Sequence, residues 1–153
     1  MYKEKIVELL NKALKDELSA SIAYKCMSEL TENGTLAEEL LAHSGEEYGH
    51  YNRILSYVFS HGLEGDIRII LDLEVSNLYP KDTKGIIKFT QDLEIEAIED
   101  YRRGALLARE NDDLETEELF KGLMSEEQGH FDDLSRYNKE RRELTSFKEY
   151  ARK

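Results

Sequence analysis

Two short segments of the sequence carry the same pair of metal-binding residue types at the same spacing. Residues 47–50 read Glu-Tyr-Gly-His, and residues 127–130 read Glu-Gln-Gly-His. Positions three apart on a helix share one face, so each carboxylate would point the same way as its imidazole. A carboxylate can bridge two metal ions while the imidazole binds one of them. Each segment is therefore a candidate half of a dimetal site.

Acidic residues interrupt the apolar stripe of every expected helix. Glu17 falls on the apolar face of a helix expected from about Lys3 to Thr31, and Glu94 does so in one expected from about Gly85 to Glu110. A buried carboxylate costs several kcal/mol unless it is compensated. Two divalent cations would balance the four inward negative charges. The complete candidate ligand set, which we also expect to carry the chemistry through the metals, is Glu17, Glu47, His50, Glu94, Glu127 and His130.

The two halves of the chain repeat one another. Glu-Glu-x-Gly-His occurs at 46–50 and 126–130, and Glu-x-x-Ala-x-x-x-Tyr occurs at 17–24 and 94–101. The halves are therefore two versions of one helix hairpin. Each repeat places a glycine in mid-helix beside the candidate ligands, where glycine costs about 1 kcal/mol relative to alanine. We expect the helices to pack closely at these glycines.

The first two of four expected helices form a tight antiparallel hairpin. Asn33-Gly34 follows the first helix and is typical of a left-handed helix cap. Thr35 would start the second helix, and Glu38, three residues on, would complete a capping box. The second helix is expected to end at about residues 61–62.

A long crossover separates this hairpin from a second one. Residues from about Leu63 to Lys84 are irregular in pattern and contain Pro80, the one proline, with room for a short helix. A connection of this length lets the third helix run parallel to the second. The turn at residues 111–113 caps a fourth helix that is expected to end near Asn138. The charged tail at 139–153 would form a short extra helix or fray.

Length and composition fit a single all-α domain over residues 1–153, with a four-helix bundle at about 3–138. The net charge of −12 disfavours nucleic acid and membranes as partners and suits a protein that attracts cations. No apolar run reaches the roughly 18 residues that span a bilayer, and the first residues lack the apolar core of a secretory signal. The single cysteine, Cys26, excludes an internal disulfide, and we expect a cytoplasmic location.

These motifs make the sequence similar to the ferritin-like di-iron superfamily, near its bacterioferritin and rubrerythrin branches. The resemblance covers about residues 3–138 and rests on the lone-Glu helices and the two Glu-Glu-x-Gly-His segments. It implies two iron ions as cofactor, with manganese or zinc as alternatives for the same ligands. By this resemblance Glu17, Glu47 and His50 would serve one ion, Glu94, Glu127 and His130 the other, and Glu47 and Glu127 would bridge both.

The resemblance implies an oxidoreductase, namely a ferroxidase that oxidises Fe2+ with O2 or H2O2. Such a protein would store or sequester iron. It would form a homo-oligomer, either a dimer or a larger cage. A rubrerythrin-like di-iron peroxidase with an external electron donor is the alternative within the superfamily. A metal-free helical interaction protein is the alternative outside it, and the inward acids argue against it. Two positions depart from the family patterns. Tyr48 replaces the methionine that binds haem in bacterioferritins, so no haem is expected there, and Ala97 replaces an extra glutamate of rubrerythrins.

Other side chains near the expected centre have competing interpretations. Glu96 would compete for the ligand position of the third helix, but its charged face favours a solvated acid. His43 is either a hydrogen-bonded core histidine, an additional ligand, or a residue that supports a ligand from behind. Tyr101 is expected in the core. Tyr24, near Glu17, is either another core aromatic or a residue that hydrogen-bonds a ligand carboxylate or is itself oxidised.

Overall fold

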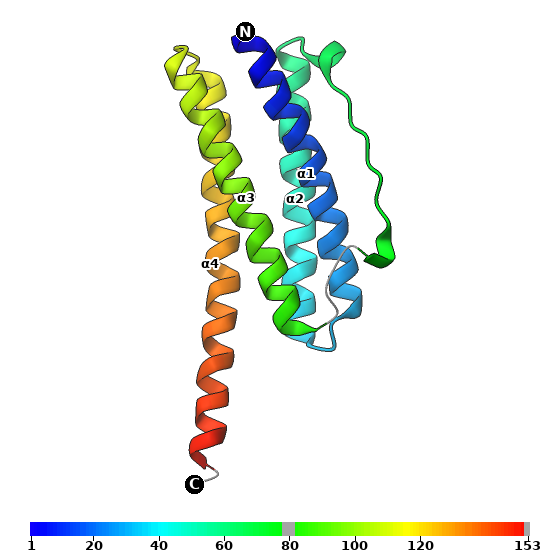
Figure 1. Ribbon diagram of the computed structural model, residues 1–153, viewed down its shortest axis with the longest axis vertical. Coiled ribbons are helices and arrows are strands. Elements are labelled where there is room, and N and C mark those ends of the chain that lie inside the picture. Colours follow the sequence, from blue (N-terminus) through cyan, green and yellow to red (C-terminus); the bar gives the residue numbers. More distant parts are fainter. Residues whose placement is uncertain (78–81, 152–153) are drawn as a thin grey trace.

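Four α-helices make up the described part of the chain, as the computed structural model shows (Figure 1). It describes residues 1–77 and 82–151, with side chains for 1–76 and 82–135, so the predicted role of Pro80 lies outside the described residues. No strand occurs within those ranges, which confirms the predicted all-α four-helix bundle. The helices are α1 (Tyr2–Leu30), α2 (Gly34–Ser60), α3 (Thr83–Glu110) and α4 (Leu114–Ala151).

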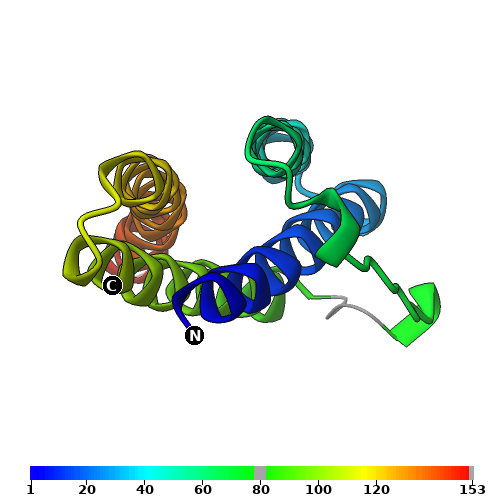
Figure 2. The same ribbon diagram turned by 90° about the horizontal axis from the view of Figure 1, so that it is seen from above.

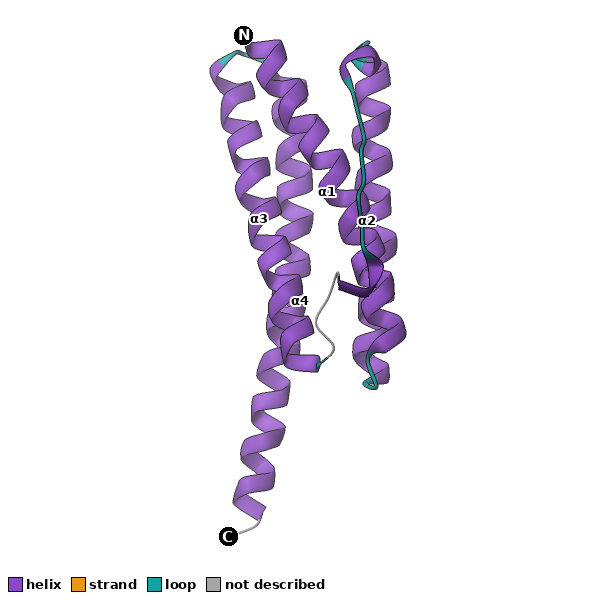
Figure 3. Cartoon of the chain, turned by 45° about the vertical axis from the view of Figure 1, so that its right-hand side comes forward, coloured by secondary structure: helices purple, strands orange, loops and turns teal. Residues whose placement is uncertain are grey.

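The bundle consists of two helix hairpins, α1–α2 and α3–α4, joined side by side. Seen along the bundle, α1 packs against α3, whereas α2 and α4 stand apart (Figure 2). The described part of the crossover, up to residue 77, runs along the outside of the bundle and carries two short 3-10 helices, Glu64–Asp66 and Val75–Asn77 (Figure 3). It returns the chain to the end where α2 began, so α3 runs parallel to α2 as the sequence predicted (Figure 1).

The turn between α1 and α2 differs from the predicted one. Asn33 has an extended backbone, with φ −86° and ψ 106°, and its side chain caps α2 by accepting a hydrogen bond from the Leu36 amide at 3.0 Å. Gly34 is the first residue of α2, and neither residue is left-handed. The predicted capping box at Thr35 is therefore wrong, because Asn33 already satisfies a free amide of the first turn.

The end of α4 also differs from the prediction. The helix does not end near Asn138 with a separate tail, but continues without a break to Ala151. The sequence from residue 130 to residue 151 contains no glycine or proline and is rich in Glu, Lys, Arg and Leu. These residues favour helix, so no local signal stops it.

Two apolar clusters fill the bundle on either side of a polar layer. One cluster includes Leu10, Leu14 and Phe120, and the other includes Met27 and Leu40. The buried acids and histidines come from the middle of the helices, between these clusters. No helix within the described residues is both long and apolar enough to cross a membrane.

Close packing occurs at a glycine other than the predicted ones. A Cβ atom on Gly104 of α3 would lie 2.7 Å from the ring of Phe120 on α4, so the absence of a side chain allows this contact. A Cβ atom on Gly49 or Gly129 would meet nothing within 4 Å. The predicted close packing at those two glycines is wrong, because α2 and α4 face each other across open space there.

Candidate dimetal centre

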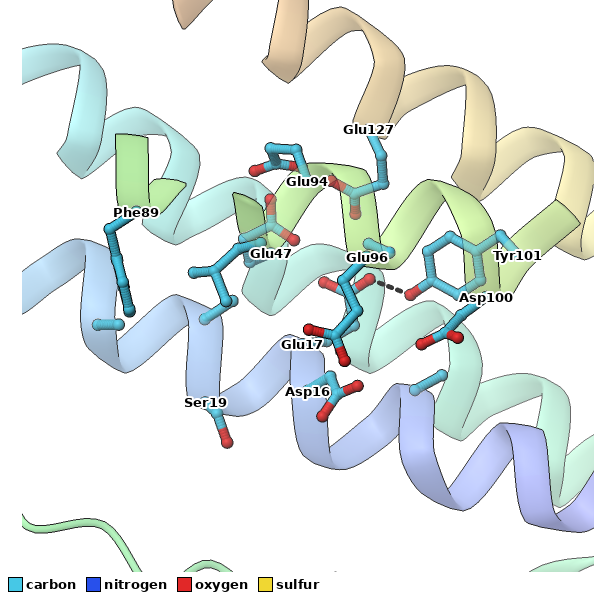
Figure 4. Close-up of a pocket in the computed structure, with 15 residues that line it drawn as sticks. Asp16, Glu17, Ser19, Glu47, Phe89, Glu94, Glu96, Asp100, Tyr101 and Glu127 are labelled. Atoms are coloured by element: carbon cyan, nitrogen blue, oxygen red, sulfur yellow. Dashed lines mark hydrogen bonds between the residues drawn. The ribbon is translucent and has the colours of Figure 1, made fainter. Parts of the chain in front are cut away.

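The six predicted ligands come together in the middle of the bundle, one or two from each helix. Their burial is almost complete, with 1–6% of each side chain exposed. Four glutamates converge from four different helices, as the close-up in Figure 4 shows for their carboxylates. The sequence periodicity that placed these acids on the inward faces thus agrees with their positions. The set comprises Glu17 of α1, Glu47 and His50 of α2, Glu94 of α3, and Glu127 and His130 of α4.

The ligand atoms form two overlapping groups. The first group consists of Glu17, Glu47, His50 and Glu127, and the second consists of Glu47, Glu94, Glu127 and His130. Within each group, one ligand atom from every residue lies within 4.8 Å of the others. Glu47 and Glu127 belong to both groups, which is the position a bridging carboxylate needs.

Both imidazoles turn the same nitrogen toward the carboxylates. The Nδ1 atom of His50 lies 2.9 Å from Glu127 Oε1, and the Nδ1 atom of His130 lies 2.8 Å from Glu47 Oε1. The Nε2 atoms face outer acids on the opposite helix, since His50 Nε2 is 3.5 Å from Glu126 Oε2 and His130 Nε2 contacts Glu46. An acid behind the imidazole fixes the orientation of a metal-binding histidine.

Two tyrosines cross between the hairpins to hold the terminal carboxylates. Tyr24 of α1 donates a hydrogen bond to Glu94 of α3. Tyr101 of α3 donates one to Glu17 of α1 (Figure 4). Tyr24 therefore contacts the ligand of the other hairpin rather than that of its own helix. Burial, followed by the adjacent carboxylate, raises the pKa of both tyrosines well above the usual value, so both remain donors. Tyr101, which the sequence placed only in the core, is the second member of this pair.

The centre contains buried polar atoms that make no hydrogen bond, including Glu47 Oε1 and His130 Nδ1, whose 2.8 Å contact lacks hydrogen-bond geometry. Native proteins satisfy most such atoms, so each one calls for a partner. Two divalent cations would supply partners to all of them and would match carboxylate oxygen and imidazole nitrogen ligands. The donor set thus fits two metal ions. The unpartnered atoms at the centre are Glu17 Oε2, Glu47 Oε1, Glu94 Oε2, Glu127 Oε2 and His130 Nδ1.

Protons compensate part of the negative charge when no metal is bound. Burial is the main cause and the contact with Glu17 the second cause that raises the pKa of Glu47 to about 7. Burial and then the contact with Glu127, in order of importance, raise the pKa of Glu94 to about 8. Burial opposes a charged His50, but its carboxylate contacts outweigh burial and raise its pKa to about 12. Burial also opposes ionisation of Glu17, yet its contacts, with Glu47 first and His50 next, lower its pKa. The metal-free centre is a cluster of acids and protonated bases.

The centre is approached from two sides of different character. Between α1 and α3 lies a cavity of about 150 Å³ with the four ligand carboxylates at its base (Figure 4). Its wall is largely apolar, but Asp16, Glu96 and Asp100 also line it. Residues of that wall include Ala13, Ala20, Ala23, Phe89, Leu93 and Ala97. On the opposite side, the α2–α4 groove, of about 420 Å³, is lined mainly by charged residues and histidines. It is lined by Glu46, Gly49, His50, Arg53, Glu126, Gly129, His130 and Asp133.

The remaining candidate residues lie around the centre rather than in it. Glu96 is 63% exposed and binds Lys12 at 3.1 Å, so Glu94 alone represents α3 at the centre. Tyr48 is 51% exposed and stacks on Tyr51, with ring centroids 5.8 Å apart. His43 is buried and stacks on His130, but its Nδ1 atom has no hydrogen-bond partner.

Comparison with known proteins agrees with this architecture. The family of ferritin-like domains, described as Ferritin, matches residues 7–143. A structure of Rhodobacter capsulatus bacterioferritin, solved at 2.6 Å with a metal-free dinuclear site and a haem iron, is similar with a TM-score of 0.74. The two chains are 26% identical, and the match covers 86% of this chain and 82% of that one. A search of curated proteins found no match. The chain belongs to the ferritin-like family.

Proposed function

We propose that this protein is a ferroxidase that oxidises Fe2+ with O2 or H2O2 and stores or sequesters the product. The observation that carries this proposal is the pair of overlapping ligand groups that share Glu47 and Glu127. The buried atoms without hydrogen-bond partners lie within these groups, which argues against a metal-free interaction protein. Fe2+ is the proposed substrate, although manganese or zinc would suit the same ligands.

Two metal ions bridged by carboxylates let an oxidant take two electrons together, and hard oxygen ligands favour the ferric product. The chain prepares this site through its own hydrogen bonds. Tyr24 and Tyr101 hold the terminal carboxylates, and Glu46 and Glu126 hold the outer nitrogens of the imidazoles. Ligands that are fixed in this way need little reorganisation when metal binds.

The two approaches suit different reactants. The wall of the α1–α3 cavity includes apolar side chains such as Ala20 and Ala97, which suit a small uncharged oxidant, together with the acids Asp16, Glu96 and Asp100. The α2–α4 groove carries Glu46, Glu126 and Asp133, whose negative charges attract cations. Ala97 also leaves the α1–α3 side without the additional carboxylate of rubrerythrins, so the peroxidase alternative gains no support from this cavity.

A homo-oligomer is part of the proposal. Leu41, Tyr48 and Phe59 are each at least 50% exposed and lie along one face of α2 at helical spacing. An exposed apolar row of this kind is typical of an interface with a second copy. No haem is proposed at Tyr48, because a tyrosine replaces the expected methionine. A cytoplasmic location without nucleic-acid or membrane partners remains our prediction.

The proposal is tested by removing the shared ligands. Glu47→Ala and Glu127→Ala should each abolish rapid aerobic oxidation of Fe2+, while circular dichroism shows an intact helical bundle. Glu96→Ala, which removes an exposed acid of α3, should oxidise iron at the wild-type rate. Unchanged oxidation in both site variants would refute the assignment. Retention of many irons per chain after desalting supports storage, whereas retention of about two favours the peroxidase.

A further inference from the structure

The internal repeat is broken at one end of the dimetal centre. Residues of α2 and α4 correspond at an offset of 80, as Glu47 with Glu127 and His50 with His130 show. Around the end formed by Glu94 and His130, three chemically active residues gather, namely Glu39, His43 and Asp133. Their counterparts by the repeat are Leu119, Leu123 and Arg53. The repeat therefore provides its own comparison, with polar residues at one end and two leucines and a cation at the other.

His43 is the residue that calls for an explanation. It is 3% exposed, whereas its counterpart Leu123 is an ordinary core residue with no exposure. The Nδ1 atom of His43 has no hydrogen-bond partner, and its Nε2 atom lies 3.9 Å from Asp133 Oδ2, beyond hydrogen-bond distance. Burying an imidazole nitrogen without a hydrogen-bond partner destabilises the folded chain. A leucine at this position would avoid that cost, so packing alone does not account for histidine.

The neighbours of His43 complete a set of metal ligands. One ligand atom each from Glu39, His43 and Asp133 lies within 4.8 Å of the others. Glu39 is one helical turn before His43 on α2, and Asp133 approaches from α4. One imidazole and two carboxylates form a set typical of Zn2+, Fe2+ and related divalent ions, with further positions open to water.

The equivalent place at the other end holds a cation that belongs to the chain. Arg53, the counterpart of Asp133, makes two hydrogen bonds to Glu126 at 2.6 and 3.0 Å. That end therefore has a guanidinium group where this end has a carboxylate. Asp133 also lines the α2–α4 groove, together with the outer acids Glu46 and Glu126.

We propose that Glu39, His43 and Asp133 form a third cation site, which binds a divalent metal ion beside the second metal position. His43 also lies in a group with Glu94 and His130 whose ligand atoms are within 4.8 Å of one another. The imidazole of His43 thus lies between a cation at the third site and the dimetal centre. Its role as a holding position for Fe2+ rests on the proposed function, whereas its existence does not.

Titration of the metal-free protein with Co2+ tests the site. Calorimetry and the visible absorption of bound Co2+ measure how many ions each chain binds. The wild-type chain should bind three ions. His43→Leu, which copies the counterpart Leu123 and keeps the core filled, should bind two, and so should Asp133→Asn. Asp132→Asn is the matched control, because Asp132 is exposed, adjacent in sequence, and accepts a hydrogen bond from Gln128 at 3.2 Å. This control should still bind three ions.

A variant without the bridging ligands separates the two proposals. Glu47→Gln combined with Glu127→Gln should leave one Co2+ ion per chain, and adding Asp133→Asn should remove it. If the wild type binds two ions and neither His43→Leu nor Asp133→Asn changes this number, the third site is refuted and the dimetal centre stands. If the wild type binds one ion that Asp133→Asn removes, the third site stands and the dimetal centre is refuted. Unfolding temperatures of all variants identify any that fail to fold.

Discussion

Glu94 gives a prediction whose size follows from its surroundings. Its side chain is 2% exposed, and burial, followed by the contact with Glu127, raises its pKa to about 8 from the usual 4.5. The folded chain holds this proton more tightly than the unfolded chain does. The resulting stabilisation is fully present below pH 4.5 and is lost as the pH rises through about 8.

Glu94→Gln removes this pH dependence, because an amide stays neutral and can still accept the hydrogen bond from Tyr24. Each pH unit between the two pKa values changes the free energy of unfolding by about 1.4 kcal/mol. From pH 5 to pH 7 the metal-free variant should therefore gain about 3 kcal/mol relative to the metal-free wild type. For a chain of this length, that corresponds to a relative rise in unfolding temperature of roughly 6–12 °C.

Thermal and urea unfolding of the chelator-treated proteins at pH 5, 6 and 7 measures the effect. Glu96→Gln is the matched control, since Glu96 lies two residues away, is 63% exposed and pairs with Lys12 on the surface. An exposed ion pair contributes about 0–1 kcal/mol, so the difference between this control and the wild type should vary little with pH. A constant difference between wild type and Glu94→Gln over this range would refute the reasoning about the buried carboxyl group.

Three further predictions concern packing, positioning and metal binding. Gly104→Ala should destabilise the protein by about 1–3 kcal/mol in urea unfolding, because the new Cβ atom would lie 2.7 Å from the Phe120 ring. Gly45 is exposed in the middle of a helix and has no such neighbour, so Gly45→Ala should stabilise the protein by up to about 1 kcal/mol. Tyr101→Phe removes the hydrogen bond to Glu17 and should weaken Co2+ binding about 10-fold or more in calorimetry with the helices intact. Metal affinity should rise with pH from 6 to 8, with proton release detectable in buffers of different ionisation enthalpy, because the contacts with carboxylates raise the pKa of both ligand histidines. Unchanged stability in Gly104→Ala, unchanged affinity in Tyr101→Phe, or affinity that is flat with pH would contradict the respective argument.

Sequence periodicity was sufficient for the fold and for the convergence of the six candidate ligands. An acid at the inward position of an otherwise apolar stripe has few explanations, and Glu17 and Glu94 stood out for that reason. The internal repeat supported the two-hairpin arrangement. It also contained the signal for Tyr101, since Tyr24 and Tyr101 occupy equivalent positions in the two halves.

Features that depend on how the two hairpins meet could not be read from one helix at a time. Periodicity places Tyr24 on the inward face, but only the packing of α1 against α3 directs its hydroxyl group to Glu94. Gly49 and Gly129 were expected to allow close packing, yet α2 and α4 leave a groove at both glycines. A missing side chain can permit close contact or leave open space, and only the separation of the helices decides between them.

Local competition explains the differences at the helix ends. Both Asn33 and Thr35 are good N-cap residues, and the choice between them depends on which carboxamide or hydroxyl oxygen reaches an amide of the first turn. In α4, the charge of the segment after Asn138 suggested a boundary. Charge does not end a helix in the absence of glycine or proline, so α4 continues to Ala151.

The most direct test of the dimetal centre is the amplitude of its first reaction with iron. Metal-free protein is mixed with excess Fe2+ in aerated buffer, and the number of ions oxidised in the initial fast phase is counted per chain. We predict two Fe2+ ions per chain for the wild type and no fast phase for Glu47→Ala combined with Glu127→Ala. A fast phase of equal amplitude in this double variant, or its absence from the wild type, would contradict the assignment of these residues.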